Sequence, residues 1–318
     1  MFLFRYLHHF VLMATNWALT SSEDEILVGG QAVIEGVMMR SPKGYSVAVR
    51  RQDGDVRVTR ELLPSVAEKW KAFKLPILRG VGVLGQALVL GIKALRFSAE
   101  EALAEEGVQS AKPVDASKTS NLLIAGNLVL ALGVNLLIFI ALPLLLTKLV
   151  QTQVGFHSSI LFNSIDGVFR VFVFVTFLFA VSKLKDMNRV FQYHGAEHKT
   201  VYNFEAREEL RVDNAAKYST LHPRCGTAFL LVVMIVSIFV FSSMHFATFA
   251  GKLLSRIVLM PLVAGISYEI IRYSAKHPKS VLRWVTFPGL MLQRITTKEP
   301  SSPQLEVAIR ALEEALTV

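Results

Sequence analysis

The chain has little charge and almost no cysteine. Only 19% of its 318 residues are charged, one is cysteine, and 52% are hydrophobic. A single cysteine excludes an internal disulfide framework and suits a reducing compartment. The low charge and a positive mean hydropathy of +0.44 exclude an ordinary soluble domain. The composition therefore predicts a membrane protein.

The sequence also lacks any motif of a nucleic-acid-binding protein, although its formal net charge is +9. In a membrane protein, excess Lys and Arg usually mark the side of the membrane that faces the cytoplasm and its anionic lipids. We therefore expect membrane lipid as a partner and no nucleic acid.

Four apolar stretches predict transmembrane helices, at about residues 122–146, 168–181, 228–246 and 253–271. Each approaches the ~20 residues that a bilayer requires, although the second needs the apolar residues before Asp166 to reach that length. Arg170 follows Asp166 by one helical turn, so the two side chains are expected to form an ion pair or to snorkel toward the membrane surface.

The distribution of Lys and Arg predicts the orientation of these spans. Basic residues are frequent before the first span, in residues 183–226 and after the last span, whereas residues 151–166 have none. The positive-inside rule then places both termini and the 183–226 loop in the cytoplasm. We expect a multi-pass protein of the cell inner (cytoplasmic) membrane.

The predicted fold class is mainly α: a polytopic helical membrane protein with a small cytoplasmic N-terminal β unit and a C-terminal amphipathic helix. Composition divides the chain into six segments, which are an apolar or interfacial segment (1–27), the β unit (28–74), an interfacial or re-entrant helix (75–97), a polar linker (98–120), the four-helix transmembrane region (121–272) and a cytoplasmic tail (273–318). The apolar core of residues 75–97 is shorter than a comfortable span.

Alternation and turn residues predict the elements of the β unit and the tail. Ala32–Met38, Tyr45–Arg50 and Val56–Thr59 are expected to be strands, and Asp53-Gly54 indicates a hairpin between the last two. In the tail, Ser302-Pro303 predicts a helix start. Leu305, Ile309, Leu312 and Leu316 then form an apolar stripe that is expected to pack against the cytoplasmic part.

The stretch FQYHGAEHKT holds an H-x-x-E-H pattern at His194, Glu197 and His198. Positions i, i+3 and i+4 share one face of a helix. Two imidazoles one turn apart can bind one divalent metal, most often zinc, and the carboxylate between them can act as a base toward water. The alternative is a surface helix with two histidines and a solvated glutamate.

A second polar stretch, LHPRCGT, holds His222 and Cys225 just before the third span. The predicted topology brings it to the same membrane surface as H-x-x-E-H. The inner end of the fourth span adds Glu269, and acidic residues in spans are frequently functional. A catalytic zinc needs three protein ligands, so the third is expected to be His222, Cys225 or Glu269. Glu269 has the alternative of an ion pair with Arg272.

Further candidate site residues lie close to these motifs. Tyr193, Lys199 and Arg224 are candidates to stabilise an oxyanion or to hold an anionic substrate. Glu35 is a polar residue in an apolar run of the β unit, either at a structural sheet edge or facing the active site.

Five stretches carry a resemblance to a known family, namely GGQAVIEGVMMR (29–40), YHGAEHKT (193–200), HPRCGT (222–227), SYEIIR (267–272) and PGLMLQRITTKEP with QLEVAI (288–309). They resemble the YqhQ family, a bacterial membrane family of unknown function that is often described as a predicted metal-dependent enzyme. The resemblance extends from Val28 to the C-terminus. It implies a membrane fold and a metal site, and it leaves the reaction open.

The H-x-x-E-H motif is also similar to that of the inverzincin metallopeptidases, whose third ligand is a glutamate far downstream. That similarity implies ligand roles for His194 and His198 and a base role for Glu197.

Two functions follow from these patterns. The first is a metal-dependent hydrolase at the inner face of the membrane, acting on a peptide, a membrane protein or a lipid-linked substrate. The alternative is a non-enzymatic membrane scaffold or assembly factor with a structural polar or metal cluster. A hydrolase requires its ligands and Glu197 to line an open cavity, whereas a scaffold predicts a closed cluster. Transport is less favoured, because the spans hold few polar residues at mid-membrane.

Overall fold

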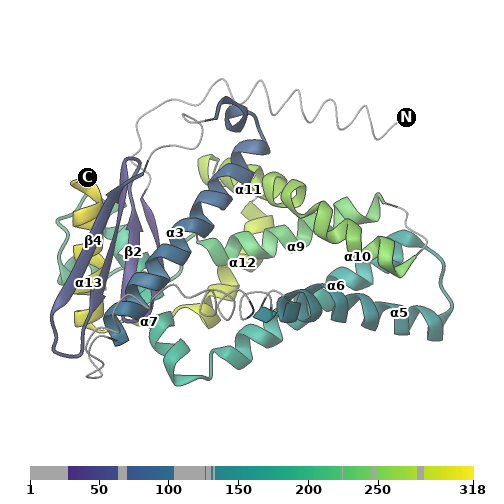
Figure 1. The fold of residues 1–318 in the computed structure, drawn as a ribbon, viewed down its shortest axis with the longest axis horizontal. Coiled ribbons are helices and arrows are strands. Elements are labelled where there is room, and N and C mark those ends of the chain that lie inside the picture. Colours follow the sequence, from purple (N-terminus) through teal and green to yellow (C-terminus); the bar gives the residue numbers. More distant parts are fainter. Residues whose placement is uncertain are drawn as a thin grey trace.

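The computed structural model describes residues 28–63, 70–103, 126, 130–131, 133–223, 225–244, 248–277 and 283–318. The interfacial segment predicted at 1–27, most of the linker and Arg224 lie outside these residues. The described chain is mainly helical, with one four-stranded antiparallel sheet near its N-terminal end (Figure 1). This architecture confirms the predicted fold class.

The sheet is an antiparallel meander in which each strand pairs with the next, and its strands are β1 (Gly29–Val33), β2 (Gly36–Arg40), β3 (Gly44–Arg50) and β4 (Val56–Leu62). The single strand predicted at Ala32–Met38 is wrong, because the chain reverses there and Val33 pairs with Gly36. Glu35 occupies the turn with a φ of 53°, a left-handed conformation that is unusual for glutamate. The hairpin predicted at Asp53-Gly54 is confirmed.

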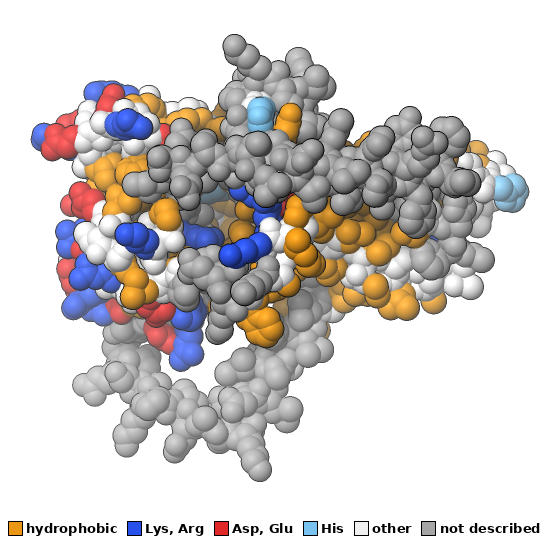
Figure 2. All heavy atoms as spheres, turned by 90° about the horizontal axis from the view of Figure 1, so that it is seen from above, with side chains coloured by type: hydrophobic (Ala, Val, Ile, Leu, Met, Phe, Trp, Pro, Cys, Tyr) orange, Lys and Arg blue, Asp and Glu red, His pale blue; other side chains and the backbone are white. Residues whose placement is uncertain are grey.

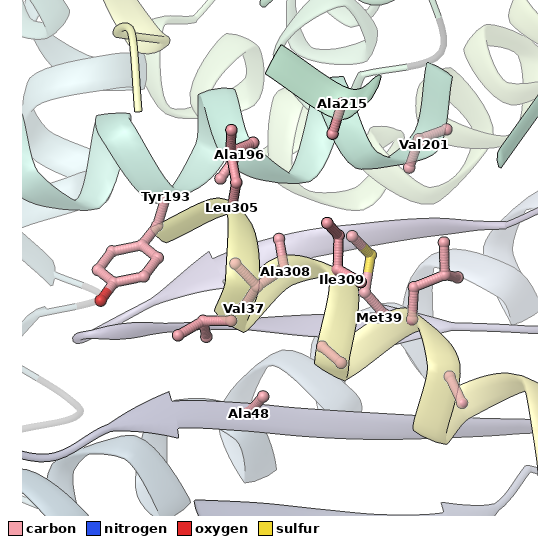
Figure 3. Close-up of a cluster of buried hydrophobic side chains, with 14 of the residues drawn as sticks. Val37, Met39, Ala48, Tyr193, Ala196, Val201, Ala215, Leu305, Ala308 and Ile309 are labelled. Carbon is pink, nitrogen blue, oxygen red and sulfur yellow. The ribbon is translucent and has the colours of Figure 1, made fainter. Parts of the chain in front are cut away.

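Helices cover both faces of the sheet. Helix α3 (Leu78–Leu103) crosses one face, and helices α7 (Lys185–Glu205) and α13 (Ser302–Leu316) cover the other (Figure 1). Side chains of β2 alternate between the two sides, as a strand requires. Met39 packs with Tyr193 and Leu305, whereas Met38 packs with Leu90. Figure 3 shows side chains of α7 and α13 meeting those of β2 and β3.

Helix α13 begins as the sequence predicts. Pro303 lies in its first turn, and the Gln304 side chain accepts a hydrogen bond of 2.9 Å from the Ser301 N–H. Of the predicted apolar stripe, Leu305 and Leu312 are fully buried, whereas Leu316 is 37% exposed. The predicted packing of this helix is therefore confirmed except at its last turn.

The remaining elements are mostly helices, namely η1 (Lys71–Lys74), η2 (Leu137–Ala141), α5 (Leu142–Val154), α6 (Ser159–Val181), α8 (Val212–Ala216), α9 (Gly226–Ser242), α10 (Phe249–Val258), α11 (Met260–Lys276) and α12 (Arg283–Thr296). Within the described residues, three helices are long and apolar enough to cross a membrane, or four if α10 and α11 form one bent span. Only 17% of the most apolar window of α6 is buried. Seen from above, charged side chains gather at the sheet end and hydrophobic ones over the helical end (Figure 2). These features indicate a membrane protein.

Three of the predicted membrane segments differ from the structure. The third span, predicted at 228–246, corresponds to the 17-residue α9, which is apolar but shorter than the helices of span length. The helix predicted at 75–97 as interfacial or re-entrant is longer, and residues 78–101 satisfy the length and composition of a span. Ion pairs from Arg96 to Glu100 and from Arg51 to Glu101 extend this helix past its apolar part. In place of the straight fourth span predicted at 253–271, α10 and α11 meet at a bend of 49°, next to Pro261, which cannot donate a backbone hydrogen bond.

A cluster of charges is buried among the apolar helices. Asp166 of α6 accepts hydrogen bonds of 2.9 Å from both Arg170 and Arg256, so the predicted Asp166–Arg170 pair is confirmed. Arg256 also donates to Asn163 at 2.8 Å, and Arg170 donates to Ser237 at 3.1 Å. The one carboxylate therefore holds two guanidinium groups and joins α6 to α10.

Candidate metal centre

In both histidines of the H-x-x-E-H motif on α7, one ring nitrogen is hydrogen-bonded to a backbone carbonyl oxygen. The Nδ1 of His194 lies 2.8 Å from the carbonyl oxygen of Thr296, and the Nδ1 of His198 contacts the carbonyl oxygen of Thr220. A carbonyl oxygen only accepts hydrogen bonds, so each Nδ1 must carry the proton. Each Nε2 then keeps a lone pair, as a metal ligand requires.

Three candidate ligand atoms converge at this point. One atom each from His194, His198 and Cys225 lies within 4.8 Å of the others, and the Nε2 of His194 is 3.2 Å from the Cys225 Sγ. Ligands of a tetrahedral zinc, bound at about 2.0–2.3 Å, lie roughly 3.3–3.8 Å apart. The group therefore fits a zinc ion with small side-chain adjustments.

Two further observations agree with a metal at this group. The Nε2 of His198 is buried and has no hydrogen-bond partner among the described residues, which is costly unless a ligand occupies it. Cys225 is the N-cap of α9, and its sulfur lies 3.5 Å from the N–H of Thr227. The candidate ligand sulfur therefore lies at the end of α9 where backbone N–H groups are free of intrahelical partners.

Glu197 lies directly beside the candidate ligands. Its side chain is buried, and its Oε2 is 3.4 Å from the Nε2 of His198. Gly30 of β1 makes room for it, because a Cβ at Gly30 would come within 2.9 Å of the Glu197 Cγ. The carboxylate thus faces the same space as the imidazole lone pair.

That space is a cavity of about 680 Å³. Its polar wall comprises His194, Glu197, His198, His222 and Cys225. The cavity is also lined by Val83, Ala87 and Leu90 of α3, by Tyr268 of α11 and by the start of β1. The volume is in the range of about 300–1,000 Å³ that small-molecule and cofactor sites occupy.

His222 lines the cavity next to the three-ligand group. Its backbone N–H and carbonyl both hydrogen-bond the Gln293 side chain at 2.7 Å, which fixes the loop before α9. Its Nε2 lies 3.4 Å from a carboxylate oxygen of Glu205. Burial lowers the pKa of His222, so the ring is neutral near pH 7. His222 therefore supports the wall, and the ring of His198 lies between it and His194.

The structure does not bring Glu269 to this group. Its carboxylate accepts hydrogen bonds from the Arg79 Nε at 2.7 Å and from the Ile77 N–H at 3.3 Å, which joins α11 to α3. Glu269 forms its ion pair with Arg79 and not with the predicted partner Arg272. Arg272 is not among the described residues that line the cavity. The candidate third ligand is thus Cys225.

The other candidate side chains hold elements together at a distance from the cavity. Glu35 accepts a hydrogen bond of 2.6 Å from Arg189 and one of 3.4 Å from the Tyr193 hydroxyl. Burial, with the nearby Glu35 carboxylate, raises the pKa of Tyr193 to about 12. Lys199 donates to the Ala216 carbonyl at 2.8 Å and pairs with Glu299. These three residues stabilise the contacts of α7.

Arg40 and Tyr268 line the cavity and were not predicted as site residues. Arg40 donates a hydrogen bond of 3.3 Å to Gln86 of α3, and no carboxylate of the described residues pairs with it. Burial lowers the pKa of Arg40. The alternation of β2 predicts that Arg40 and Met38 share a face, but only the position of α3 shows that this face borders the cavity.

The position of His194 depends on the close contact between α7 and the chain before α13. The Lys298 N–H donates to the Phe191 carbonyl at 2.9 Å, and a Cβ on Gly195 would overlap the Lys298 carbonyl oxygen. We expect Gly195→Ala to lower the free energy of unfolding by about 1–3 kcal/mol, although alanine favours helix. Thermal unfolding in detergent measures this, with Gly85→Ala, where a Cβ meets nothing within 4 Å, as the matched control. Equal melting temperatures for the two variants would contradict the expectation.

Comparisons with known proteins place the chain in a family. Residues 75–318 match a family described as "Protein of unknown function (DUF1385)". The chain is also 32% identical over 296 residues to "Uncharacterized protein YqhQ" of Bacillus subtilis (strain 168), covering 91% of this chain and 92% of that protein. The chain belongs to the DUF1385 family. The YqhQ resemblance of the sequence motifs is thereby confirmed, and no solved structure matches this DUF1385 protein. Neither description states an activity.

Proposed function

We propose that this protein is a metal-dependent hydrolase at the cytoplasmic face of the bacterial inner membrane, with zinc held by His194, His198 and Cys225. The observation that carries the proposal is the convergence of three ligand atoms within 4.8 Å, beside a buried glutamate, on the wall of an open cavity. A scaffold with a closed cluster would not need this cavity.

The residues around the cavity have distinct roles in this proposal. A bound zinc supplies Lewis acidity and lowers the pKa of water toward ~7. Glu197 accepts the proton of the attacking water at a carboxylate oxygen and returns it to the leaving group. The carbonyl oxygens of Thr296 and Thr220 hold the two imidazoles in the tautomer that leaves Nε2 free.

The proposed location is supported by the division of the molecule into a charged end and an apolar end (Figure 2). The cavity is lined by residues of the sheet and of the start of α9. The distribution of Lys and Arg favours the cytoplasmic side for this region. A peptide, a membrane protein or a lipid-linked molecule at the membrane surface would reach it.

The substitution Glu197→Gln tests the proposal, because it preserves shape and removes the base. We expect the variant to retain its zinc and to lose hydrolysis by about 10²–10⁴-fold. Zinc content by elemental analysis and turnover of a panel of fluorogenic peptides, esters and phosphodiesters measure the two properties.

The exposed Glu313→Gln is the matched control and should keep both properties. A wild-type protein that neither contains nor takes up zinc would exclude the hydrolase and favour the scaffold. Wild-type turnover by Glu197→Gln would exclude Glu197 as the base.

A further inference from the structure

Strand β1 is an edge strand that borders the candidate metal centre. The strand order is β1-β2-β3-β4, so β1 pairs only with β2. Gly29, Gly30 and Gln31 of this strand line the same cavity as His194 and Glu197. An exposed edge presents unpaired backbone groups to which another extended chain can add.

The pairing of β2 shows which groups of β1 point outward. The Arg50 N–H donates to the Glu35 carbonyl at 2.9 Å, so Glu35 and every second residue after it direct their backbone groups toward β3. The alternate residues of β2, namely Gly36, Met38 and Arg40, therefore form their backbone hydrogen bonds with β1. Their partners in β1 are the odd-numbered residues Val33, Gln31 and Gly29. Gly30 and Ala32 are left with their N–H and carbonyl groups directed away from β2.

These outward groups have no backbone hydrogen-bond partner in the described part of the chain. Next to them, Gly29 and Gly30 have no side chains, so a second backbone can approach closely. A Cβ at Gly30 would collide with the Met38 carbonyl and come within 2.9 Å of the Glu197 Cγ. Glycine at position 30 therefore allows this edge of the sheet to lie directly beside the proposed base.

We propose that β1 binds the substrate, an extended polypeptide segment, as an added strand that carries its scissile peptide bond to the metal centre. This inference rests on the proposed hydrolase and names its substrate class as unfolded or locally extended polypeptide. Five residues of β1 correspond to about 17 Å of extended chain. In the reaction, water adds across the C–N bond. Its oxygen goes to the carbonyl carbon and its proton passes through Glu197 to the amine.

The two walls of the cavity predict which side chains such a substrate carries. Alternate side chains of an added strand point to opposite faces of the sheet. One set faces α7, which carries Glu197, His194 and His198, and the other set faces Val83, Ala87 and Leu90 of α3. The substrate strand therefore carries apolar residues at every second position on the α3 side.

Hydrogen–deuterium exchange on the zinc-loaded, full-length Glu197→Gln protein tests this inference, with β-casein as the unfolded polypeptide probe. We expect fragments covering residues 29–33 to exchange about tenfold more slowly when β-casein is present. The opposite edge strand, Val56–Leu62, is the internal control and should not change. Equal protection of both edges would overturn the inference as non-specific binding.

A second measurement uses wild-type protein and a peptide that it cleaves from β-casein. Two methylated forms of this peptide are compared as inhibitors of β-casein cleavage, one with methyl groups on the backbone nitrogens of its odd-numbered residues and one on those of its even-numbered residues. One of the two forms should inhibit about tenfold or more weakly than the unmethylated peptide, because its methyl groups remove the hydrogen bonds to the edge of β1. Equal inhibition by the two methylated forms would overturn the inference.

The outcomes separate the inference from the proposed function. Zinc-dependent turnover of esters without protection of β1 overturns the strand-addition inference and leaves the hydrolase standing. Protection of β1 in a protein that binds no zinc overturns the hydrolase and leaves a polypeptide-binding edge. Protection together with zinc-dependent cleavage supports both.

Discussion

Replacing His194 or His198 with alanine is expected to remove the metal from the detergent-purified protein. We expect about one zinc per wild-type chain, and a loss of affinity of at least about 100-fold in either variant, because each removes one of three protein ligands. The Nε2 atoms of the two rings are the free ones, since Thr296 and Thr220 occupy the Nδ1 atoms. Cys225→Ser should have the same effect by removing the sulfur. Elemental analysis after dialysis against a weak chelator measures the bound zinc.

The matched control is His157→Ala, which removes an exposed imidazole that belongs to no ligand group of the described residues. Its zinc content should equal that of the wild type. Zinc that remains at full occupancy in both His194→Ala and His198→Ala would contradict the metal centre. Zinc lost from both but kept in Cys225→Ser would restrict the site to the histidines, and Glu197 or His222 would then be the third ligand to test.

The substitution Asp166→Asn is expected to destabilise the helical region by about 3–5 kcal/mol, the usual cost of removing one partner from a buried ion pair. Asp166 and Arg256 are both 2% exposed, and Arg170 is 8% exposed. The neutral amide would leave two guanidinium groups buried in apolar surroundings without a countercharge. The contact between α6 and α10 would weaken first, because Asp166 holds Arg256 across it.

Denaturant or thermal unfolding in detergent measures this loss, and the exposed Asp213→Asn on α8 is the matched control. The zinc content of Asp166→Asn should stay at the wild-type level while the protein is folded, since Asp166 is not part of the metal centre. Equal stability of the two variants would contradict a structural role for the buried cluster.

Local patterns predicted those parts of the fold and candidate site that depend on near neighbours in sequence. The Asp53-Gly54 hairpin, the start of α13 and the Asp166–Arg170 pair were predicted from residues no more than four positions apart, which turn chemistry and the helix period relate directly. The common face of His194 and His198 follows from the same period. The turn at Glu35 was missed, because a left-handed glutamate has no signature in sequence.

Long-range contacts explain what the sequence did not predict. Arg79 lies 190 residues from Glu269, and Arg256 lies 90 residues from Asp166, so neither pairing could be inferred from spacing. Cys225 and not Glu269 is the candidate third ligand, because the ion pair with Arg79 holds the Glu269 carboxylate away from the two histidines. Arg40 and Tyr268 reach the cavity only because α3 and α11 pack together beside the sheet.

Cys225 is at once the first cap of α9 and a candidate ligand. The 17 residues of α9 span about 26 Å, less than the ~30 Å thickness of a bilayer's hydrocarbon core. Such a hydrophobic mismatch is relieved by local thinning of the lipid or by displacement of the helix along the membrane normal. In a bilayer, a displacement of α9 would move the Cys225 sulfur relative to His194 and His198, which belong to α7. The length of the lipid chains is therefore expected to affect the distances among the three candidate ligands.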